Sequence, residues 1–211
     1  MIKVLTGKQR GENAALFEQL FRLRHDVFIK RRNWSLGSRL GQLEIDEYDV
    51  DEAIYVFDFD NLGGILASVR LTPSDRYSLI ADYFPHLVED DFFKVRSPDV
   101  YEGMRFMTAP VLSSKEAARA RLRVLYAMVE WCLEHRIRWI QGATDVEFFP
   151  TFVQMTIQTT PMGLAQEYAG GRKAPGGGEC IAFRWPVTRG ILEALRCYGE
   201  QEALWTPTYV H

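Results

Sequence analysis

Residues 54–72 read IYVFDFDNLGGILASVRLT, and this stretch gives the clearest indication of a β-sheet in the chain. Two strand-like runs, Ile54–Phe59 and Gly64–Thr72, flank an Asp-Asn-Leu-Gly turn, which is a strong β-hairpin pattern. Because alternate side chains of a strand share a face, the second run has an apolar face and places Arg70 on the other. The hairpin therefore predicts a sheet that carries a buried or half-buried arginine.

Helical patterns lie on both sides of this hairpin. Asn13 precedes an apolar stripe that runs to Phe28, and Ser113 forms a capping box with Glu116 before a long amphipathic helix. Shorter helices are expected at residues 79–84, 148–155 and 188–198, the last one ending at Gly199, and further strands at 100–108, 138–144 and 179–185. Strands flanked by helices around one core indicate an α/β layered fold.

Composition sets limits on the class of protein. A chain of 211 residues with 47% hydrophobic residues fits one domain, residues 1–211, and a net charge of −3 gives no general attraction to nucleic acid. We find no apolar stretch long enough for a signal peptide or a membrane span, so we expect a cytoplasmic protein without a membrane partner. Three cysteines without CxxC spacing and four scattered histidines predict no metal site.

An ordered series of charged and aromatic residues occupies the first half of the chain. It consists of RxxxF (Arg24 and Phe28), Trp34, ExDxxD (Glu44, Asp46 and Asp49), Arg70, Phe84 and ExxRF (Glu102, Arg105 and Phe106). Part of the series falls in residues 33–51, which lack periodicity and read as a long loop, a common location of functional residues.

This series resembles the acyl-homoserine-lactone synthase family, the LuxI-type autoinducer synthases. The resemblance implies a single-domain, three-layer fold related to the GNAT N-acetyltransferases, with a mixed central sheet. It also implies that the part up to about residue 110 binds S-adenosyl-L-methionine (SAM), and that residues 111–211 bind the acyl donor.

The resemblance implies an acyltransferase of quorum sensing. Its reaction would acylate the amine of SAM from an acyl thioester and then close a lactone, releasing methylthioadenosine; both reactants are substrates, and no cofactor is expected. Ammonium binding and deprotonation need carboxylates and a base, the sulfonium suits aromatic faces, and a carboxylate suits arginine. The candidate catalytic residues are Asp46, Asp49, Arg70 and Glu102, and the candidate SAM-binding residues are Arg24, Phe28, Trp34, Phe84, Arg105 and Phe106.

Glu102 is the leading candidate for the general base, acting directly or through a water. It lies an odd number of residues from Arg105, so regular pleating would send the two side chains to opposite faces. A bulge at Gly103 would turn both toward one site. The alternatives are a strand-end salt bridge for Glu102, and a purely structural ion cluster of Arg70 with Asp46 and Asp49.

The acyl group needs an apolar pocket. Candidates for its wall are Met128, Trp139, Thr144 and Phe148. For most of these a place in the core is the better interpretation, whereas Thr144 resembles a family position associated with acyl-chain choice. The donor is acyl carrier protein or acyl-CoA. Basic residues at four-residue spacing on the long helix, Lys115, Arg119 and Arg123, suit an acidic carrier protein or a solvated face.

Other features bear on the donor and on rival functions. The segments AIYVFDFD, RLTP, DYFPHL and PDVYEGMRF resemble a subgroup that uses branched or aromatic acyl-CoA, while residues 109–114 lack the glycines of an ordinary acetyl-CoA loop. A GNAT-like N-acyltransferase acting on another amine is the second reading. A noncatalytic binding module is the third.

Overall fold

The computed structural model describes residues 1–34, 36, 42–89, 93–155, 158–168 and 178–204. Its centre is an eight-stranded sheet in the order β1-β2-β3-β4-β5-β8-β6, with β7 also paired to β8. Among the strands of the described residues, only β4 and β5 pair in parallel, so the sheet is mixed. The strands are β1 (Ile2–Thr6), β2 (Ile54–Phe59), β3 (Ile65–Pro73), β4 (Val100–Thr108), β5 (Trp139–Asp145), β6 (Thr160–Pro161), β7 (Gln166–Tyr168) and β8 (Gly178–Pro186).

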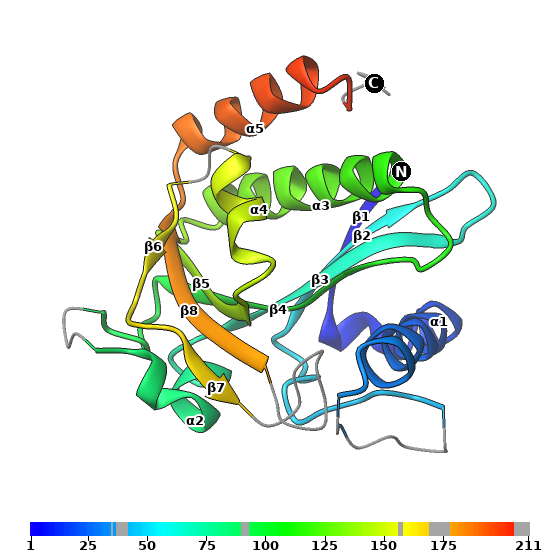
Figure 1. Ribbon diagram of the computed structural model, residues 1–211. Coiled ribbons are helices and arrows are strands. Elements are labelled where there is room, and N and C mark those ends of the chain that lie inside the picture. Colours follow the sequence, from blue (N-terminus) through cyan, green and yellow to red (C-terminus); the bar gives the residue numbers. More distant parts are fainter. Residues whose placement is uncertain (35, 37–41, 90–92, 156–157, 169–177, 205–211) are drawn as a thin grey trace.

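Helices cover both faces of this sheet (Figure 1). They are α1 (Ala14–Arg24), α2 (Leu79–Tyr83), α3 (Ser114–Glu134), α4 (Phe149–Gln154) and α5 (Arg189–Gln201), with a π-helical turn η2 (His25–Arg31) and short 3₁₀ turns η1 (Gly7–Arg10) and η3 (Pro85–Leu87). α3, α4 and α5 lie on one face, and α1 and α2 lie on the other. This confirms the three-layer α/β fold with a mixed sheet. No helix within the described ranges is long and apolar enough to cross a membrane.

Two main apolar clusters hold the layers together. On the α3 face, Leu122 and Leu125 pack in one cluster with Val69 of β3, while on the α1 face Phe17 packs against Tyr55 of β2. Burying one such side chain is worth about 1.5–3 kcal/mol, so these clusters supply the main drive for folding. Ser113 and Glu116 make the predicted capping box that starts α3.

The predicted hairpin is present, with β2 antiparallel to β3. The Asp60 carboxylate accepts hydrogen bonds from the backbone N–H groups of Leu62 and Gly64, both at 2.8 Å, and Gly63 has a φ of +85°, which suits glycine. Arg70 lies on the face opposite Val69, as alternation predicted.

Some boundaries differ from expectation. The last helix continues through Gly199 to Gln201, so the expected stop was wrong. Strands β1, β6 and β7 were not expected, and the Asn13 side chain donates to the Gln9 carbonyl instead of capping α1. The glycine-rich stretch at residues 170–178 also predicts a loop from its composition, and all of it except residue 178 lies outside the described residues.

β4 contains a bulge at Arg105. Gly103 pairs regularly with Leu71, so the bulge predicted at Gly103 was wrong. The register instead shifts between Ser68 and Arg70 of β3, where Arg105 and Phe106 together oppose one residue, and Arg105 has a φ of +53°. The side chain of Arg105 therefore reaches the α1 face, while Phe106 packs against the cluster on the α3 face.

β4 and β5 remain paired over a short length only. Val100–Glu102 pairs with Trp139–Gln141, and beyond these residues the two strands are no longer paired. A Cβ atom on Gly142 would lie 3.1 Å from the Gly103 carbonyl oxygen, so glycine permits this close approach just before the pairing ends. The sheet thus has an opening between the later parts of β4 and β5.

Candidate active site

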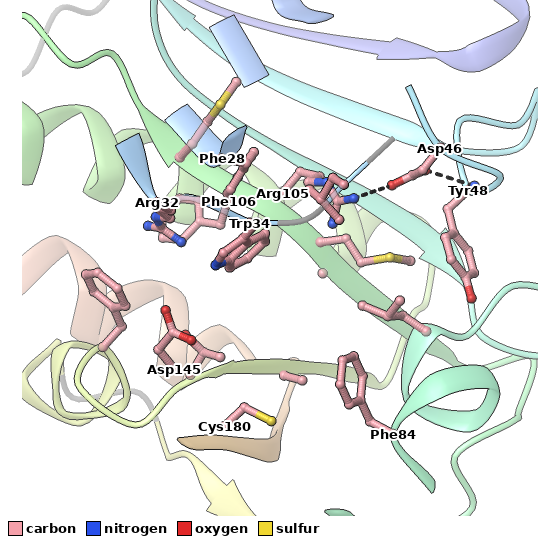
Figure 2. Close-up of a pocket in the computed structure, with 18 of the residues that line it drawn as sticks. Phe28, Arg32, Trp34, Asp46, Tyr48, Phe84, Arg105, Phe106, Asp145 and Cys180 are labelled. Carbon is pink, nitrogen blue, oxygen red and sulfur yellow. Dashed lines mark hydrogen bonds and ion pairs between the residues drawn. The ribbon is translucent and has the colours of Figure 1, made fainter. Parts of the chain in front are cut away.

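A cavity of about 650 Å³ lies at this opening. Residues 103–108 of β4 and 143–145 of β5 line it, together with side chains from η2, α2, α4, β8 and the segment at 44–48. Figure 2 shows aromatic and charged side chains facing one another across it. Its volume is in the range of cavities that hold small-molecule ligands.

The inner layer of the charged wall is a buried ion cluster. Arg70 donates to both Asp46 oxygens, at 2.6 and 3.0 Å, and its Nη1 lies 2.7 Å from Asp49 Oδ1. Asp49 also accepts from Arg24 Nη1 and from the Tyr55 hydroxyl, each at 2.8 Å. Burial alone would raise the pKa of Asp49, but the charges of Arg70 and Arg24 outweigh it and hold that pKa well below its usual range. Asp49 is therefore ionised in the folded protein.

The outer layer of the same cluster borders the cavity. Arg105 Nη2 lies 2.8 Å from both Glu44 Oε1 and Asp46 Oδ2, and Glu44 also pairs with Arg24. Burial would raise the pKa of Asp46, yet Arg70 and Arg105 lower it overall. Three arginines thus balance three carboxylates, and Asp46 and Arg105 are the members with the greatest exposure, at 12% and 10% of their side chains.

The candidate site residues separate into those on the cavity wall and those behind it. Arg24, Asp49 and Arg70 lie behind the wall, where they position Asp46. The candidates on the wall are Phe28, Trp34, Asp46, Phe84, Arg105, Phe106, Thr144 and Phe148.

An aromatic group forms the next part of the wall. The π-helical turn leads to Asn33, which has a φ of +54°, and the Trp34 N–H donates to the Phe28 carbonyl at 2.9 Å. This brings the two rings into a stack with centroids 5.0 Å apart. The Arg32 guanidinium lies over both rings, at 5.3 and 5.6 Å, and over Phe148 at 4.8 Å. The rings therefore already hold a cation, and Trp34 Nε1 is buried without a hydrogen-bond partner among the described residues.

Glu102 lies beneath the wall rather than on it. Its carboxylate is fully buried and accepts from the Ser78 hydroxyl at 2.7 Å, the Ile80 N–H at 3.0 Å and Gln141 Nε2 at 2.9 Å. Burial raises its pKa, although these hydrogen bonds act in the opposite direction. It therefore anchors the start of α2 to β4. It makes no salt bridge with any residue that the structure describes, and it does not line the cavity, whose β4 wall begins at the next residue, Gly103.

Two acyl-pocket candidates lie elsewhere. The expectation for Trp139 was wrong, because it begins β5 at the end remote from Thr144, beside Arg184. Met128 belongs to the core under α3 and borders a separate cavity of about 30 Å³. The two cavities share the lining residues Gly103, Phe106, Phe152 and Phe183.

The proposed basic patch on α3 is partly engaged within the chain. Arg119 Nε donates to the Leu204 carbonyl at 3.1 Å, and Arg123 lies 3.1 Å from Asp58, while Lys115 is exposed.

Several wall residues were not anticipated from the sequence. Tyr48, Asp145, Tyr168 and Cys180 line the cavity, and Tyr48 donates to Asp82 at 2.8 Å. An aspartate at the end of a strand, as Asp145 ends β5, is the one pattern that would have marked any of them.

Known proteins are similar to this chain in sequence and in fold. Residues 8–155 match the family model described as autoinducer synthase. The chain is 27% identical over 168 residues to the isovaleryl-homoserine lactone synthase of Bradyrhizobium diazoefficiens, covering 78% of this chain and 73% of that one. It is 31% identical over 179 residues to the acyl-homoserine-lactone synthase of Ralstonia nicotianae, covering 83% and 84%.

Solved structures agree with these matches. The CoA-dependent acyl-homoserine lactone synthase MesI superposes with a TM-score of 0.77 at 26% identity, covering 94% of this chain and 95% of that one. BjaI, solved with SAM and isopentyl-CoA, has the same fold, with a TM-score of 0.80 at 23% identity and coverage of 100% and 92%. A putative N-acetyltransferase from Lactobacillus plantarum, at 14% identity, has a TM-score of 0.58 over 89% of this chain and 99% of that one, in line with the GNAT-like layout. The chain therefore belongs to the autoinducer synthase family of acyltransferases, the acyl-homoserine-lactone synthases.

Proposed function

We propose that this enzyme makes an acyl-homoserine lactone from SAM and an acyl thioester that meet at the opening between β4 and β5. The observation that carries the proposal is the contrast between the two sides of one cavity. Asp46 and Arg105 reach it from the α1 face, whereas Thr144, Phe152 and Phe183 belong to the α3 and α4 side. The binding sites of the two substrates are then separated by the faces of the sheet more than by the two parts of the sequence before and after about residue 110.

The charged face suits the amino-acid end of SAM. Asp46 is ionised and borders the cavity, so it attracts the ammonium group, while Arg105 is placed to orient the carboxylate. The Phe28–Trp34 pair is the candidate site for the sulfonium. The cation that it already holds, Arg32, supports this assignment, and the two cations would compete for the same rings.

The reaction then has two steps. The SAM amine loses a proton and attacks the thioester carbonyl, so that an amide bond forms and the thiol leaves with a proton. The SAM carboxylate next attacks its own γ-carbon, which closes the lactone and breaks the bond to sulfur, releasing methylthioadenosine.

The source of the base follows from the pKa shifts. The lowered pKa of Asp46 makes it a good anion for binding and a weak proton acceptor. Glu102 has the raised pKa that suits a base, but it reaches the cavity only if a water relays the proton. We therefore keep Glu102 as a base through water, and its hydrogen bonds to Ser78 and Ile80 make support of α2 the competing role.

The acyl side is apolar. We propose that Phe106, Phe152 and Phe183 surround the acyl chain and that Thr144 bears on its choice. The relatives named above include an isovaleryl-homoserine lactone synthase and two CoA-dependent enzymes, which favours a branched acyl-CoA over acyl carrier protein as the donor.

One assay tests the function. The enzyme is incubated with SAM and a panel of straight, branched and aromatic acyl thioesters, presented on coenzyme A or on carrier protein, and the products are measured by mass spectrometry. Lactone and methylthioadenosine should form in equal amounts, and Asp46→Asn should reduce both. Thioester consumption with another amine and no methylthioadenosine would support the N-acyltransferase alternative, and absence of turnover with every donor would support a binding module.

A further inference from the structure

Asp145 is a buried carboxylate with one unused oxygen on the cavity wall. The residue is 9% exposed and ends β5, and its Oδ1 accepts a hydrogen bond from the Tyr168 hydroxyl. Oδ2 is buried and has no hydrogen-bond partner in the part of the chain that the structure describes. Figure 2 shows Asp145 on the side of the cavity opposite Arg105 and Trp34. Since a buried acceptor without a partner is costly, this oxygen points to a ligand that donates a hydrogen bond.

The face of the sheet identifies which substrate Asp145 meets. Ala143, two residues earlier in β5, packs in the cluster that contains Ile80 of α2, and so does Cys180, the residue paired with Asp145. Because alternate residues share a face, Asp145 lies on the α2 side and Thr144 on the opposite side. Asp145 therefore shares the face of Asp46, which is the face assigned above to SAM.

SAM has three kinds of hydrogen-bond donor: the ammonium group, the adenine amine and the ribose hydroxyls. The ion cluster suits the ammonium group, so the adenine amine and the ribose hydroxyls remain as candidate partners for Asp145. We propose that Asp145 Oδ2 accepts a hydrogen bond from a ribose hydroxyl of SAM, and this rests on the proposed function. Carboxylates commonly bind ribose in this way, and the Tyr168 hydroxyl acts as a positioning group that fixes the other oxygen.

Methylthioadenosine is the direct probe, because it contains the adenosine part of SAM without the amino-acid part. Its affinity is measured by titration calorimetry for the wild type and for Asp145→Asn, which keeps an oxygen for Tyr168. A hydrogen bond to a charged group predicts a loss of about 10- to 100-fold. Asp46→Asn is the matched control, expected to weaken SAM binding while leaving methylthioadenosine binding within about twofold, because the probe lacks the ammonium.

Deoxy analogues test the same contact without a variant. The wild type should bind one of the two analogues, 2′-deoxy- or 3′-deoxy-methylthioadenosine, about 10- to 100-fold more weakly than methylthioadenosine itself. For that analogue, Asp145→Asn should cause little additional loss of affinity. Tyr168→Phe keeps the carboxylate, so its loss of affinity should be smaller. Thermal melting checks that each variant is folded.

Two results would overturn the proposal. One is unchanged methylthioadenosine affinity in folded Asp145→Asn, and the other is equal affinity of the wild type for the parent compound and both deoxy analogues. Either result alongside lactone formation by the wild type rejects only the ribose contact. Absence of lactone formation with every acyl donor rejects the proposed function itself.

Discussion

Arg70→Met tests whether the buried ion cluster supports the site by supporting the fold. Arg70 is 1% exposed and bridges Asp46 and Asp49 at 2.6–3.0 Å. Removing it leaves three carboxylates with two arginines, and an uncompensated buried charge costs about 3–5 kcal/mol. For a domain of this size, a loss of 1 kcal/mol lowers Tm by about 2–4 °C, so we expect Tm to fall by about 6–20 °C. Urea unfolding followed by circular dichroism measures the loss of stability directly.

Two further variants make the interpretation specific. Arg76→Met removes an arginine that lies 2.9 Å from Glu52 with its side chain 54% exposed, so it should cost no more than about 1 kcal/mol. Arg70→Met with Asp49→Asn removes one charge of each sign, and it should be more stable than Arg70→Met alone by at least about 1 kcal/mol. A cost for Arg70→Met as small as that of Arg76→Met would refute the reasoning, as would a double variant less stable than either single one.

Three other predictions address the aromatic wall, Glu102 and pH. Trp34→Ala should weaken SAM binding about 2- to 30-fold, by loss of about 0.5–2 kcal/mol of cation–π attraction, and unchanged affinity by calorimetry would place the sulfonium elsewhere. Glu102→Gln places an amide NH2 group, a second donor, against the Ile80 N–H. If Glu102 supports α2, the free energy of unfolding in urea should fall by about 1–3 kcal/mol. Full stability with a strongly reduced kcat would instead establish Glu102 as the base. The pKa of Asp49 is lowered in the folded state, so the stability that Asp49 contributes is present above its ordinary pKa of about 4 and is lost as pH falls below that value. In thermal melts, Asp49→Asn should therefore lose less stability between pH 5 and pH 3 than the wild type does.

Much of the fold was predictable because it follows local periodicity. The alternation in residues 54–72 gave the hairpin and the face of Arg70, and the capping box of Ser113 and Glu116 gave the start of α3. The short strands β6 and β7 have no such pattern, because they exist only through pairing with β8.

The candidate site was predictable in its members more than in its geometry. The ordered motifs named Asp46 and Arg105 as candidates, and the structure places both on one wall of the cavity. The bulge was assigned to Gly103 because glycine is its usual marker, whereas the structure places the left-handed backbone at Arg105, where tertiary ion pairs hold it. Burial of Glu102 depends on the packing of α2, which no spacing along the chain reveals.

The opening between β4 and β5 also bears on how such an enzyme changes over generations. Under the proposed division, a substitution at Thr144 of β5 alters the room for one reactant while the opposite surface of the sheet keeps its contacts, because neighbouring residues of a strand project to opposite sides. A few codon changes would then be enough for bacterial lineages to diverge in the acyl group of the lactone that they release. The residues that bind SAM, the precursor common to all these lactones, would be inherited unchanged.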